Sequence, residues 1–437
     1  MFLAFYRRKG SAILILMQRD KEMTILEALL EDFHDLLKDT KHCVQRNAVF
    51  PETDKMIKVA IGMRRTGKTY FLYQYIHQLL KQKIPIESIL YINFEDDRLL
   101  PMNQKEMAEL IESFYTLYPE NHHRNCYLFL DELQNIEGWE LVVRRFFDTR
   151  KVQIYLTGSS AKLLSKEIAT SLRGRSLSVE IWPYDFEEYL LAHKIVKPNK
   201  PIGKKTIDMF QKHFREFLKI GGFPAIQGLS ESLQRETLQS YVETVIFRDV
   251  VERHNVTNIA LLKYLTNTLL KNFASLFTAN KFYKDIKSQG FQVSKDTIYN
   301  YLDYLEDAYL IATVPILTES LRQSQITPKK IYAVDNGLVQ ANVFSQTDNL
   351  GRLFENQVYL DLRRQNEKIF YYRTRSGYEI DFITESKNGK REIIQVVWDM
   401  KDKQTREREE RALQEAEHEL NIPGRIIDKE SYIRGFL

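Results

Sequence analysis

The sequence predicts an α/β fold with a doubly wound, mainly parallel sheet in the first part of the 437-residue chain. Three observations predict it. Short apolar runs typical of buried strands alternate with stretches whose apolar residues recur at helical spacing. A glycine-containing loop follows the first of these runs, and a later run ends in two acidic residues. Ligands of such sheets bind beyond the carboxyl ends of the strands, which is where the loop and the acidic pair lie.

The composition is that of a folded protein, with 43% hydrophobic and 28% charged residues. The length suggests roughly two to four domains. A formal net charge of +4 gives no support by itself for nucleic-acid binding. The two cysteines, Cys43 and Cys126, form no metal or disulfide pattern, which fits a reducing compartment. The expected location is therefore cytoplasmic.

Residues 1–50 are expected to form an N-terminal extension and a helix. Basic residues precede an apolar run at residues 12–17, which resembles a weak signal sequence. That run is shorter than a usual signal core and is followed by charged residues instead of a small-residue cleavage site. It is also too short to span a bilayer, so no membrane partner is expected. We interpret the first ~20 residues as a disordered or misassigned extension, with Met17 and Met23 as alternative starts.

The glycine-containing loop, GMRRTGKT, fits the phosphate-loop pattern G-x-x-x-x-G-K-[ST]. Backbone N–H groups of such a loop face phosphate oxygens, and the helix that follows adds the positive end of its dipole. We therefore expect this loop and the next residue to bind the nucleotide. These residues are Gly62, Met63, Arg64, Arg65, Thr66, Gly67, Lys68, Thr69 and Tyr70.

Two side chains of the loop have expected roles in chemistry. Lys68 would reach the β- and γ-phosphates, and the Thr69 hydroxyl would ligate magnesium. The alternative is an idle strand-to-helix turn. It is disfavoured because an apolar run at residues 56–61 precedes the loop and a helical pattern at residues 71–80 follows it. Strand, loop and helix thus come in the required order.

Further strands and helices are expected after the loop. The strand candidates are residues 89–94, 126–130, 152–156 and 177–181. The helical patterns between them are residues 102–118, 138–150 and 161–172.

The strand at residues 126–130 runs directly into Asp131 and Glu132. Asp131 is expected to hold the magnesium ion through water, and Glu132 to orient and polarise the attacking water. The alternative is an acidic pair at the surface end of a strand, which is common in proteins. A phosphate loop upstream favours the catalytic interpretation.

Other candidate catalytic residues follow the next strand. Thr157 could hold the water or sense hydrolysis, while Ser159 or Ser160 could instead cap the next helix. Arg173 and Arg175 offer guanidinium groups for the charge that develops during phosphoryl transfer, in cis or from a neighbouring subunit. The alternative for both arginines is a surface ion pair.

Three segments resemble a known family: GMRRTGKTYFL, YLFLDELQNIEGWE and YLTGSSAKLLSKEIATSLRGRSLSVEIWPYDFEEYL. They resemble the AAA-type P-loop ATPases of bacteria and archaea in which an uncharacterised C-terminal domain with a restriction-endonuclease-like core is fused to the ATPase. The resemblance covers nearly everything after about residue 50. It implies an AAA-like P-loop NTPase core at residues 51–184, a strand order of 5-1-4-3-2, and ATP as the nucleotide.

Two helical regions are expected next. Residues 185–256 are expected to form a helical lid, interrupted by a turn at residues 221–224. Residues 257–316 have the order of a winged helix-turn-helix, whose third helix begins at Ser294 as a helix-capping residue.

The residues of the third helix of this module disfavour a role in reading DNA sequence. A recognition helix presents Arg, Lys, Asn or Gln outward. This one carries Lys295 and Asn300 together with several acidic residues. Lys281, Lys284 and Lys287 on the preceding helix could meet phosphates, although a solvated face is favoured. DNA or RNA therefore stays a candidate partner.

From Gly351 the sequence reads helix, three strands, helix and strand. This order resembles the restriction-endonuclease-like core, which is expected at residues 317–437. The metal site of that core takes an acid from the first helix, an Asp from the second strand and an acid-x-Lys pair from the third. Glu355 and Asp381 occupy the first two places, but the third reads Gln395-Val396-Val397.

Strand alternation places Glu392 on the opposite face from Gln395, so it cannot substitute without a bulge. With no lysine expected in this site, nuclease activity is not expected. Glu355 and Asp381 would be metal ligands or buried partners of Arg373 or Tyr378.

Together these features predict an ATP-binding, magnesium-dependent ATPase that uses the nucleotide cycle to change its contacts with a partner. A homo-oligomer is expected if Arg173 or Arg175 acts in trans. The alternatives are a nuclease that ATP regulates, and a signalling switch that binds ATP and turns over slowly.

Overall fold

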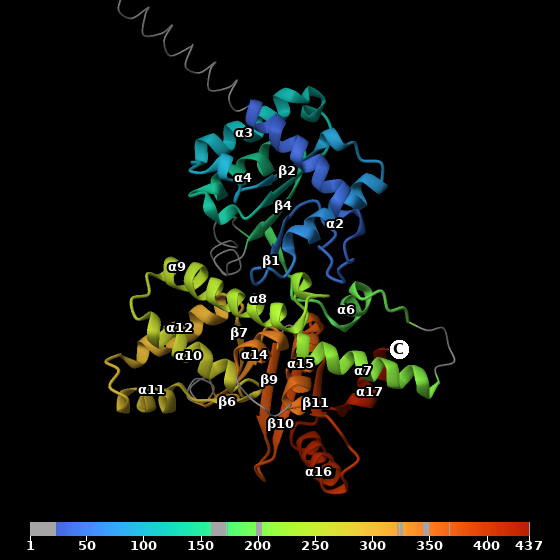
Figure 1. Cartoon of the computed structure of the whole chain (residues 1–437), viewed down its shortest axis with the longest axis vertical. Coiled ribbons are helices and arrows are strands. Elements are labelled where there is room, and N and C mark those ends of the chain that lie inside the picture. The colour runs from blue at the N-terminus through green and yellow to red at the C-terminus, as the bar shows by residue number, and fades with distance from the viewer. Residues whose placement is uncertain are drawn as a thin grey trace, which may run out of the picture. The chain divides into compact units, whose positions relative to one another are not determined.

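The computed structural model describes residues 23–158, 172, 174–197, 203–320, 323, 327–343, 349–366 and 368–436. The chain divides into two compact units. The first comprises the chain up to Gly62 and Gly67–Ile181, and the second comprises Met63–Thr66 and Trp182–Leu437 (Figure 1). Arg173, Ser159, Ser160 and most of the helix expected at residues 161–172 lie outside the described residues.

A five-stranded parallel sheet forms the centre of the first unit, in the order β2-β3-β4-β1-β5. The strands are β1 (Ile57–Ile61), β2 (Ile89–Asn93), β3 (Cys126–Asp131), β4 (Val152–Gly158) and β5 (Ser176–Glu180). This arrangement confirms the expected order and each of the five predicted strands. Every residue of β1 and β3 is buried, as expected for strands covered on both faces.

The helices of the first unit follow the predicted ranges closely. They are residues 23–39, α2 (Lys68–Lys81), α3 (Gln104–Leu117) and α4 (Trp139–Thr149). Short 3-10 turns occupy Thr40–His42, Ile86–Ser88, Asp97–Leu99, Pro119–His122 and Leu133–Asn135. Helix α3 begins with a capping box, in which Asn103 accepts the backbone N–H of Glu106 and the Glu106 side chain accepts that of Asn103.

The second unit begins with helices around a glycine turn. The helices are α6 (Phe186–Ala192), α7 (Lys204–Ile220), α8 (Glu231–Thr244), a π-helix (Val245–Val251), α9 (Glu252–His254) and α14 (Asn336–Asn342), with a 3-10 turn at Pro224–Ile226. At the turn, Gly222 accepts a backbone bond from Tyr184 and donates to the buried carboxylate of Asp335. A Cβ at Gly222 would lie 2.2 Å from the Tyr184 carbonyl oxygen, so this position requires glycine.

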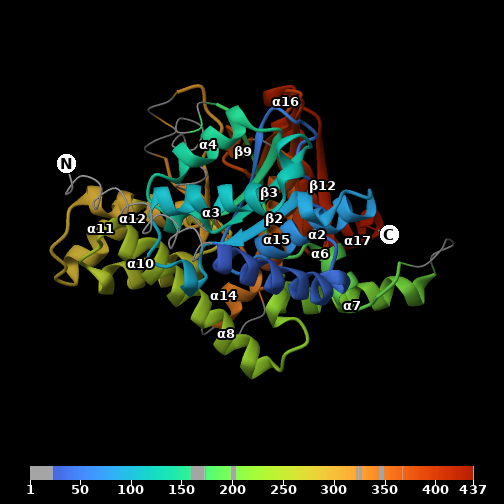
Figure 2. The same cartoon turned by 90° about the horizontal axis from the view of Figure 1, so that it is seen from above.

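Three helices and a small sheet follow. They are α10 (Ile259–Lys271), α11 (Ala279–Ser288) and α12 (Lys295–Asp307), and they lie together in both views (Figures 1 and 2). Ser294 accepts the backbone N–H of Thr297, which confirms the predicted cap. The antiparallel sheet has the order β6-β8-β7, from β6 (Ser275–Phe277), β7 (Ile311–Val314) and β8 (Lys329–Ala333). Strand β8 lies beyond the boundary expected at residue 316.

The last part of the chain has the predicted element order, with one helix added at its end. The elements are α15 (Leu350–Gln365), β9 (Lys368–Arg373), β10 (Glu379–Glu385), β11 (Arg391–Val397), α16 (Lys403–Leu420), β12 (Gly424–Asp428) and α17 (Lys429–Phe436). The sheet order is β12-β11-β10-β9, with only β11 and β12 parallel.

Helices α15 and α16 pack against different side chains of this sheet. Ile380, Ile383 and Ile393 pack with alanines of α16, whereas Phe382 and Ile394 belong to the core that contains the buried residues of α15. An irregularity in the pairing of β10 with β9, between Ile380 and Ile383, places these two isoleucines on one face although they are three residues apart. None of the helices described here is long and apolar enough to cross a membrane.

Candidate nucleotide-binding and hydrolysis site

The phosphate loop follows β1 and contains three residues with positive φ: Gly62 at 145°, Arg65 at 69° and Gly67 at 93°. Left-handed residues interleaved with ordinary ones curl a backbone so that successive N–H groups form a concave anion site. Glycine takes such angles at little cost, while a left-handed arginine costs roughly 1 kcal/mol. Helix α2 begins directly after Gly67 with Lys68. The loop therefore has the backbone geometry expected for phosphate binding.

Lys68 links the loop to the acidic pair. Its side chain is only 4% exposed, and its ammonium donates to the Gly62 carbonyl oxygen at 3.2 Å. The same nitrogen lies 3.8 Å from Oε1 of Glu132. This ion pair connects the phosphate loop with the acidic pair, across 64 positions of the sequence.

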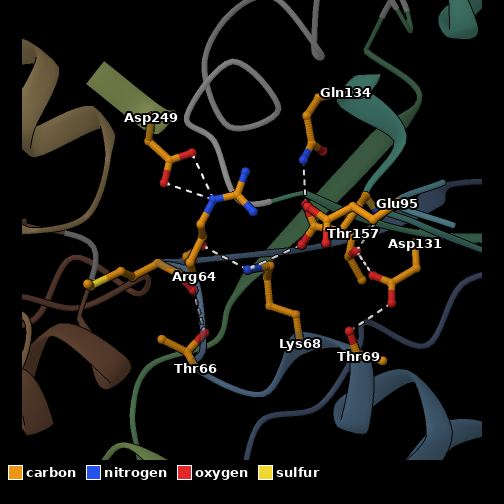
Figure 3. A network of polar contacts seen from close by, with 12 residues as sticks. Arg64, Thr66, Lys68, Thr69, Glu95, Asp131, Gln134, Thr157 and Asp249 are labelled. Carbon is orange, nitrogen blue, oxygen red and sulfur yellow. Dashed lines mark hydrogen bonds and ion pairs between the residues drawn. The ribbon is translucent and has the colours of Figure 1, made fainter. Parts of the chain in front are cut away.

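Asp131 lies at the end of β3 and is fully buried. Three hydroxyl groups donate to it, and those of Thr69 and Thr157 are drawn in Figure 3. Thr69 donates to Oδ2 at 2.7 Å, Tyr91 to the same oxygen at 2.9 Å, and Thr157 to Oδ1. Burial raises the pKa of Asp131, and the nearby charge of Glu132 raises it further. Hydroxyl donors partly offset the cost of the buried charge.

Tyr91 is the member of this network that the sequence did not reveal. It lies on β2, in a strand otherwise made of aliphatic residues and one asparagine. Burial raises the pKa of its hydroxyl well above the usual range, so Tyr91 acts here as a neutral donor. The only signal in the sequence is a tyrosine near the carboxyl end of a buried strand, and that is not specific.

Glu132 adopts a left-handed backbone, with φ of 54° and ψ of 44°. Its N–H donates to Oγ1 of Thr157 at 3.0 Å, and Gln134 donates to its carboxylate. Thr157 therefore contacts both members of the acidic pair. A left-handed glutamate stores roughly 1–3 kcal/mol of strain, which neighbouring bonds must maintain. Such strain is typical of functional positions.

The donor set fits a magnesium ion. Thr69 and Asp131 present two hard oxygen atoms 2.7 Å apart. A hydrated magnesium ion bound by the Thr69 hydroxyl would therefore be within reach of Asp131 through one of its water ligands. Among the described residues no group of three or more His, Cys, Asp or Glu is placed to hold a metal by itself in the structure as it stands. A partial protein shell is what magnesium shared with substrate phosphates uses.

The tip of the loop groups with the second unit. Arg64 is ion-paired with Asp249 at 3.1 Å, and Asp249 is fully buried in the π-helix. Met63 belongs to the hydrophobic core of that unit, and Thr66 donates its hydroxyl to the Met63 carbonyl at 3.0 Å. The side chain of Tyr70 is largely exposed. The described contacts of Arg64 and Met63 thus involve other parts of the protein, which leaves their nucleotide contact a prediction.

Arg175 forms an ion pair with Asp148, and its side chain is 43% exposed. This is the surface pairing that the sequence left open as the alternative. No described hydrogen bond or ion pair connects Arg175 with Lys68, Asp131 or Glu132. A catalytic role for Arg175 therefore stays a prediction.

A second cluster corrects the expectation for the last domain. Glu355 and Asp381 contact neither Arg373 nor Tyr378 by a described bond, but both contact Lys330 of β8. The expectation that no lysine lies in this site was wrong. Strand β8 was not predicted, and 25 residues of chain separate Lys330 from Glu355.

Gln395 does not join the cluster through its side chain amide. Its amide group donates to Glu409 of α16 at 2.7 Å, and its side-chain oxygen accepts only the backbone N–H of Asp381. The Asp381 carboxylate instead accepts the backbone N–H of Val396 at 2.9 Å. Burial raises the pKa of Glu355 to about 7, and the charge of Asp381 adds to this effect.

A parallel sheet with a phosphate loop after β1 and a buried acidic pair after β3 defines a P-loop ATPase domain. A family model described as an AAA domain matches residues 54–190, so this part of the chain is an AAA-type P-loop ATPase domain. Two further models, both of domains of unknown function (DUF8612 and DUF4143), match residues 211–348 and 350–430.

The chain belongs to the family of the uncharacterized protein MJ1544 of Methanocaldococcus jannaschii. The two are 37% identical over 410 residues, which cover 92% of this chain and 88% of the relative. An uncharacterized protein of Haemophilus influenzae is 31% identical over 341 residues, covering 78% of this chain and 82% of that protein. Among solved structures, the Walker-type ATPase PABY2304 of Pyrococcus abyssi aligns with a TM-score of 0.39 and 13% identity, over 65% of this chain and 90% of that chain.

Proposed function

We propose that this protein binds ATP and hydrolyses it with magnesium, and that the nucleotide cycle changes its contacts with a partner. One observation carries the proposal: Lys68 and Thr69, at the start of α2, reach Glu132 and Asp131, at the end of β3. Cation, hydroxyl, metal-binding carboxylate and second carboxylate are thus assembled at one edge of the sheet. This is the set that phosphoryl transfer to water needs.

Each residue has a role that its contacts support. Lys68 neutralises charge on the β- and γ-phosphates, from a position held by the Gly62 carbonyl. Thr69 would ligate the magnesium ion and Asp131 would hold it through water, and the bound ion would neutralise charge on the phosphate oxygens. Glu132 orients a water molecule whose oxygen attacks the γ-phosphorus, while the bond from that phosphorus to the bridging oxygen breaks. Thr157 fixes Glu132 through its backbone N–H.

The partner is proposed to be a macromolecule, with DNA or RNA as the first candidates. Lys281, Lys284 and Lys287 are exposed on α11, and Lys295 is exposed at the start of α12. Exposed Asp285 and Asp296 lie among these lysines, which weakens the positive field. Nucleic acid is therefore a candidate that an assay must test.

We place this activity in the cytoplasm, because Cys43 and Cys126 are both free thiols in the structure. If Arg175 or Arg173 completes the site of a neighbouring subunit, the active form is a homo-oligomer.

The experiment measures phosphate release from ATP by the purified protein with double-stranded DNA, single-stranded DNA, RNA or no addition. Turnover that requires magnesium and that a nucleic acid accelerates supports a nucleic-acid partner. Equal turnover under all four conditions supports ATPase activity with another partner. Tight ATP binding with barely measurable turnover would favour the slow switch. Lys68→Ala is the control, because residual phosphate release in that variant reports contaminating ATPases.

A further inference from the structure

Three carboxylates surround one buried ammonium group in the last part of the chain. Lys330 Nζ lies 2.8 Å from Asp381, 2.9 Å from Glu379 and 3.1 Å from Glu355. The lysine comes from β8, the two strand acids from β10, and Glu355 from α15. Four residues from three elements thus meet at one point.

The ammonium is held too deeply to be a surface ion pair. Lys330 is 2% exposed and Asp381 is 8% exposed. Burying an unpaired charge costs several kcal/mol, so a lysine in this position needs carboxylate partners. An ammonium has three N–H donors, and here three carboxylate oxygens lie within 3.1 Å of it. Two of these contacts, with Glu355 and Asp381, are hydrogen bonds, and Glu379 adds an ion pair.

The surrounding bonds fix this arrangement. Strand β8 is paired on both sides, through Leu276 of β6 and Val314 of β7, so the backbone of Lys330 is held in place. Tyr332, two residues further on β8, donates to the same Glu355 oxygen at 2.7 Å. Asn356 of α15 bonds both the N–H and the carbonyl of Ala333. Helix α15 and strand β8 are thus joined independently of Lys330.

Clusters of carboxylates without a nearby cation bind divalent metals, because hard oxygen ligands and negative charge favour them. In this cluster the chain itself places a cation among the oxygens. A divalent ion at the same point would lie against a buried ammonium and would compete for oxygens already bonded to it.

We propose that Lys330 is the resident cation of the Glu355–Glu379–Asp381 cluster, that it excludes a divalent metal, and that this part of the chain does not hydrolyse phosphodiesters. The cluster instead joins β8 to the sheet of β9–β12. This inference is independent of the proposed ATPase function.

The test measures Mn²⁺ binding by isothermal titration in nucleotide-free full-length protein. The wild type and Asp381→Asn are expected to bind the same amount of Mn²⁺, since no ion occupies the cluster. Lys330→Met keeps the length of the side chain but removes the charge, and is expected to gain about one Mn²⁺ per chain. That gain should vanish in Lys330→Met/Asp381→Asn. Lys330→Arg, which keeps a cation, should gain none.

Two results of the Mn²⁺ titrations would overturn the proposal. One is Mn²⁺ binding in the wild type that Asp381→Asn removes, and this comparison requires no change at Lys330. The other is a folded Lys330→Met, with the circular dichroism of the wild type, that gains no Mn²⁺. If Lys330→Met does not fold, the proposal is tested by comparing Mn²⁺ binding of the wild type and Asp381→Asn, and by a cleavage assay. Supercoiled DNA with Mn²⁺ should stay intact, and cleavage that Asp381→Ala abolishes would contradict the proposal.

Discussion

The carboxylate of Asp131 shows how much of the site rests on hydroxyl groups. Thr69, Tyr91 and Thr157 come from α2, β2 and β4, and all three donate to it. Thr157 has a second role, since it accepts the backbone N–H of the left-handed Glu132. One hydroxyl thus holds Asp131, the proposed metal-binding acid, and Glu132, the proposed water-orienting acid, in a fixed relation.

Replacing Thr157 by valine is expected to damage both stability and turnover. Valine has the shape of threonine but leaves the buried N–H of Glu132 and one oxygen of Asp131 without this partner, which costs about 1–3 kcal/mol. ATP turnover should fall because Glu132 loses its anchor. Urea unfolding and phosphate release measure the two effects. Thr157→Ser keeps the hydroxyl and is the matched control. Wild-type behaviour of Thr157→Val in both assays would show that the anchor is unnecessary.

Among single residues, the sequence predicted those candidate site residues that belong to a short local motif. Lys68, Thr69, Asp131 and Glu132 follow from a loop motif and from the end of an apolar strand. Tyr91 and Lys330 did not follow, because each meets its acid only through long-range pairing, across 40 and 51 residues. Neither residue belongs to a sequence motif that indicates its role.

At the scale of elements, the strands of the first unit were predictable because both faces are buried and the apolar runs are continuous. Strand β6 has three residues and β8 five, and neither run alternates clearly enough to identify a strand. The irregularity in β10 could not be predicted either. Assigning faces by alternation assumes regular strand pairing, and the register shift between Ile380 and Ile383 interrupts that alternation.

Two helical glycines offer a matched test of close packing in the second unit. A Cβ on Gly337 of α14 would lie 2.0 Å from the Ile220 carbonyl oxygen, whereas one on Gly351 of α15 would meet nothing nearer than 3.9 Å. Gly337→Ala should therefore destabilise the protein by several kcal/mol, or prevent folding, because backbone must move. Gly351→Ala should be neutral or stabilise by up to about 1 kcal/mol. Thermal unfolding compares them, and equal midpoints would refute the close contact.

At the scale of the whole molecule, the grouping of Met63–Thr66 with the second unit could not be predicted from the sequence. Nothing in a loop motif says which side chains of the loop will pack elsewhere. Arg64 is bound to Asp249, 185 residues further along the chain. The sequence alone does not show that these two residues are in contact.

The second unit should be more stable in mild acid than at neutral pH. Burial raises the pKa of Asp335 and of Asp361 to about 6, despite the Arg364 charge that acts on both. The unfolded chain releases these protons near pH 4, and the folded protein keeps them to about pH 6. These two groups therefore make the unfolding free energy fall as pH rises through that window. Urea unfolding at several pH values measures the slope, which Asp361→Asn should reduce. An unchanged slope in that variant would contradict the burial effect.

Assembly is the other property that belongs to the whole molecule. If Arg175 acts in trans, turnover per subunit should rise with protein concentration, and Arg175→Ala should bind ATP but hydrolyse it slowly. The ion pair with Asp148 provides the control, since Asp148→Asn removes the pairing but keeps the guanidinium. Light scattering that shows a monomer with concentration-independent turnover would exclude the trans role.

The central claim is that ATP is bound by the loop around Lys68 and hydrolysed with the help of Glu132. The most direct measurement combines ATP binding by isothermal titration with phosphate release for Lys68→Ala, Glu132→Gln and the wild type. Lys68→Ala should lose nucleotide binding, because the loop loses the buried ammonium that is proposed to neutralise the phosphates. Glu132→Gln should bind ATP as the wild type does but release no phosphate, since only the group that polarises water is lost. Wild-type turnover in either variant would contradict the account.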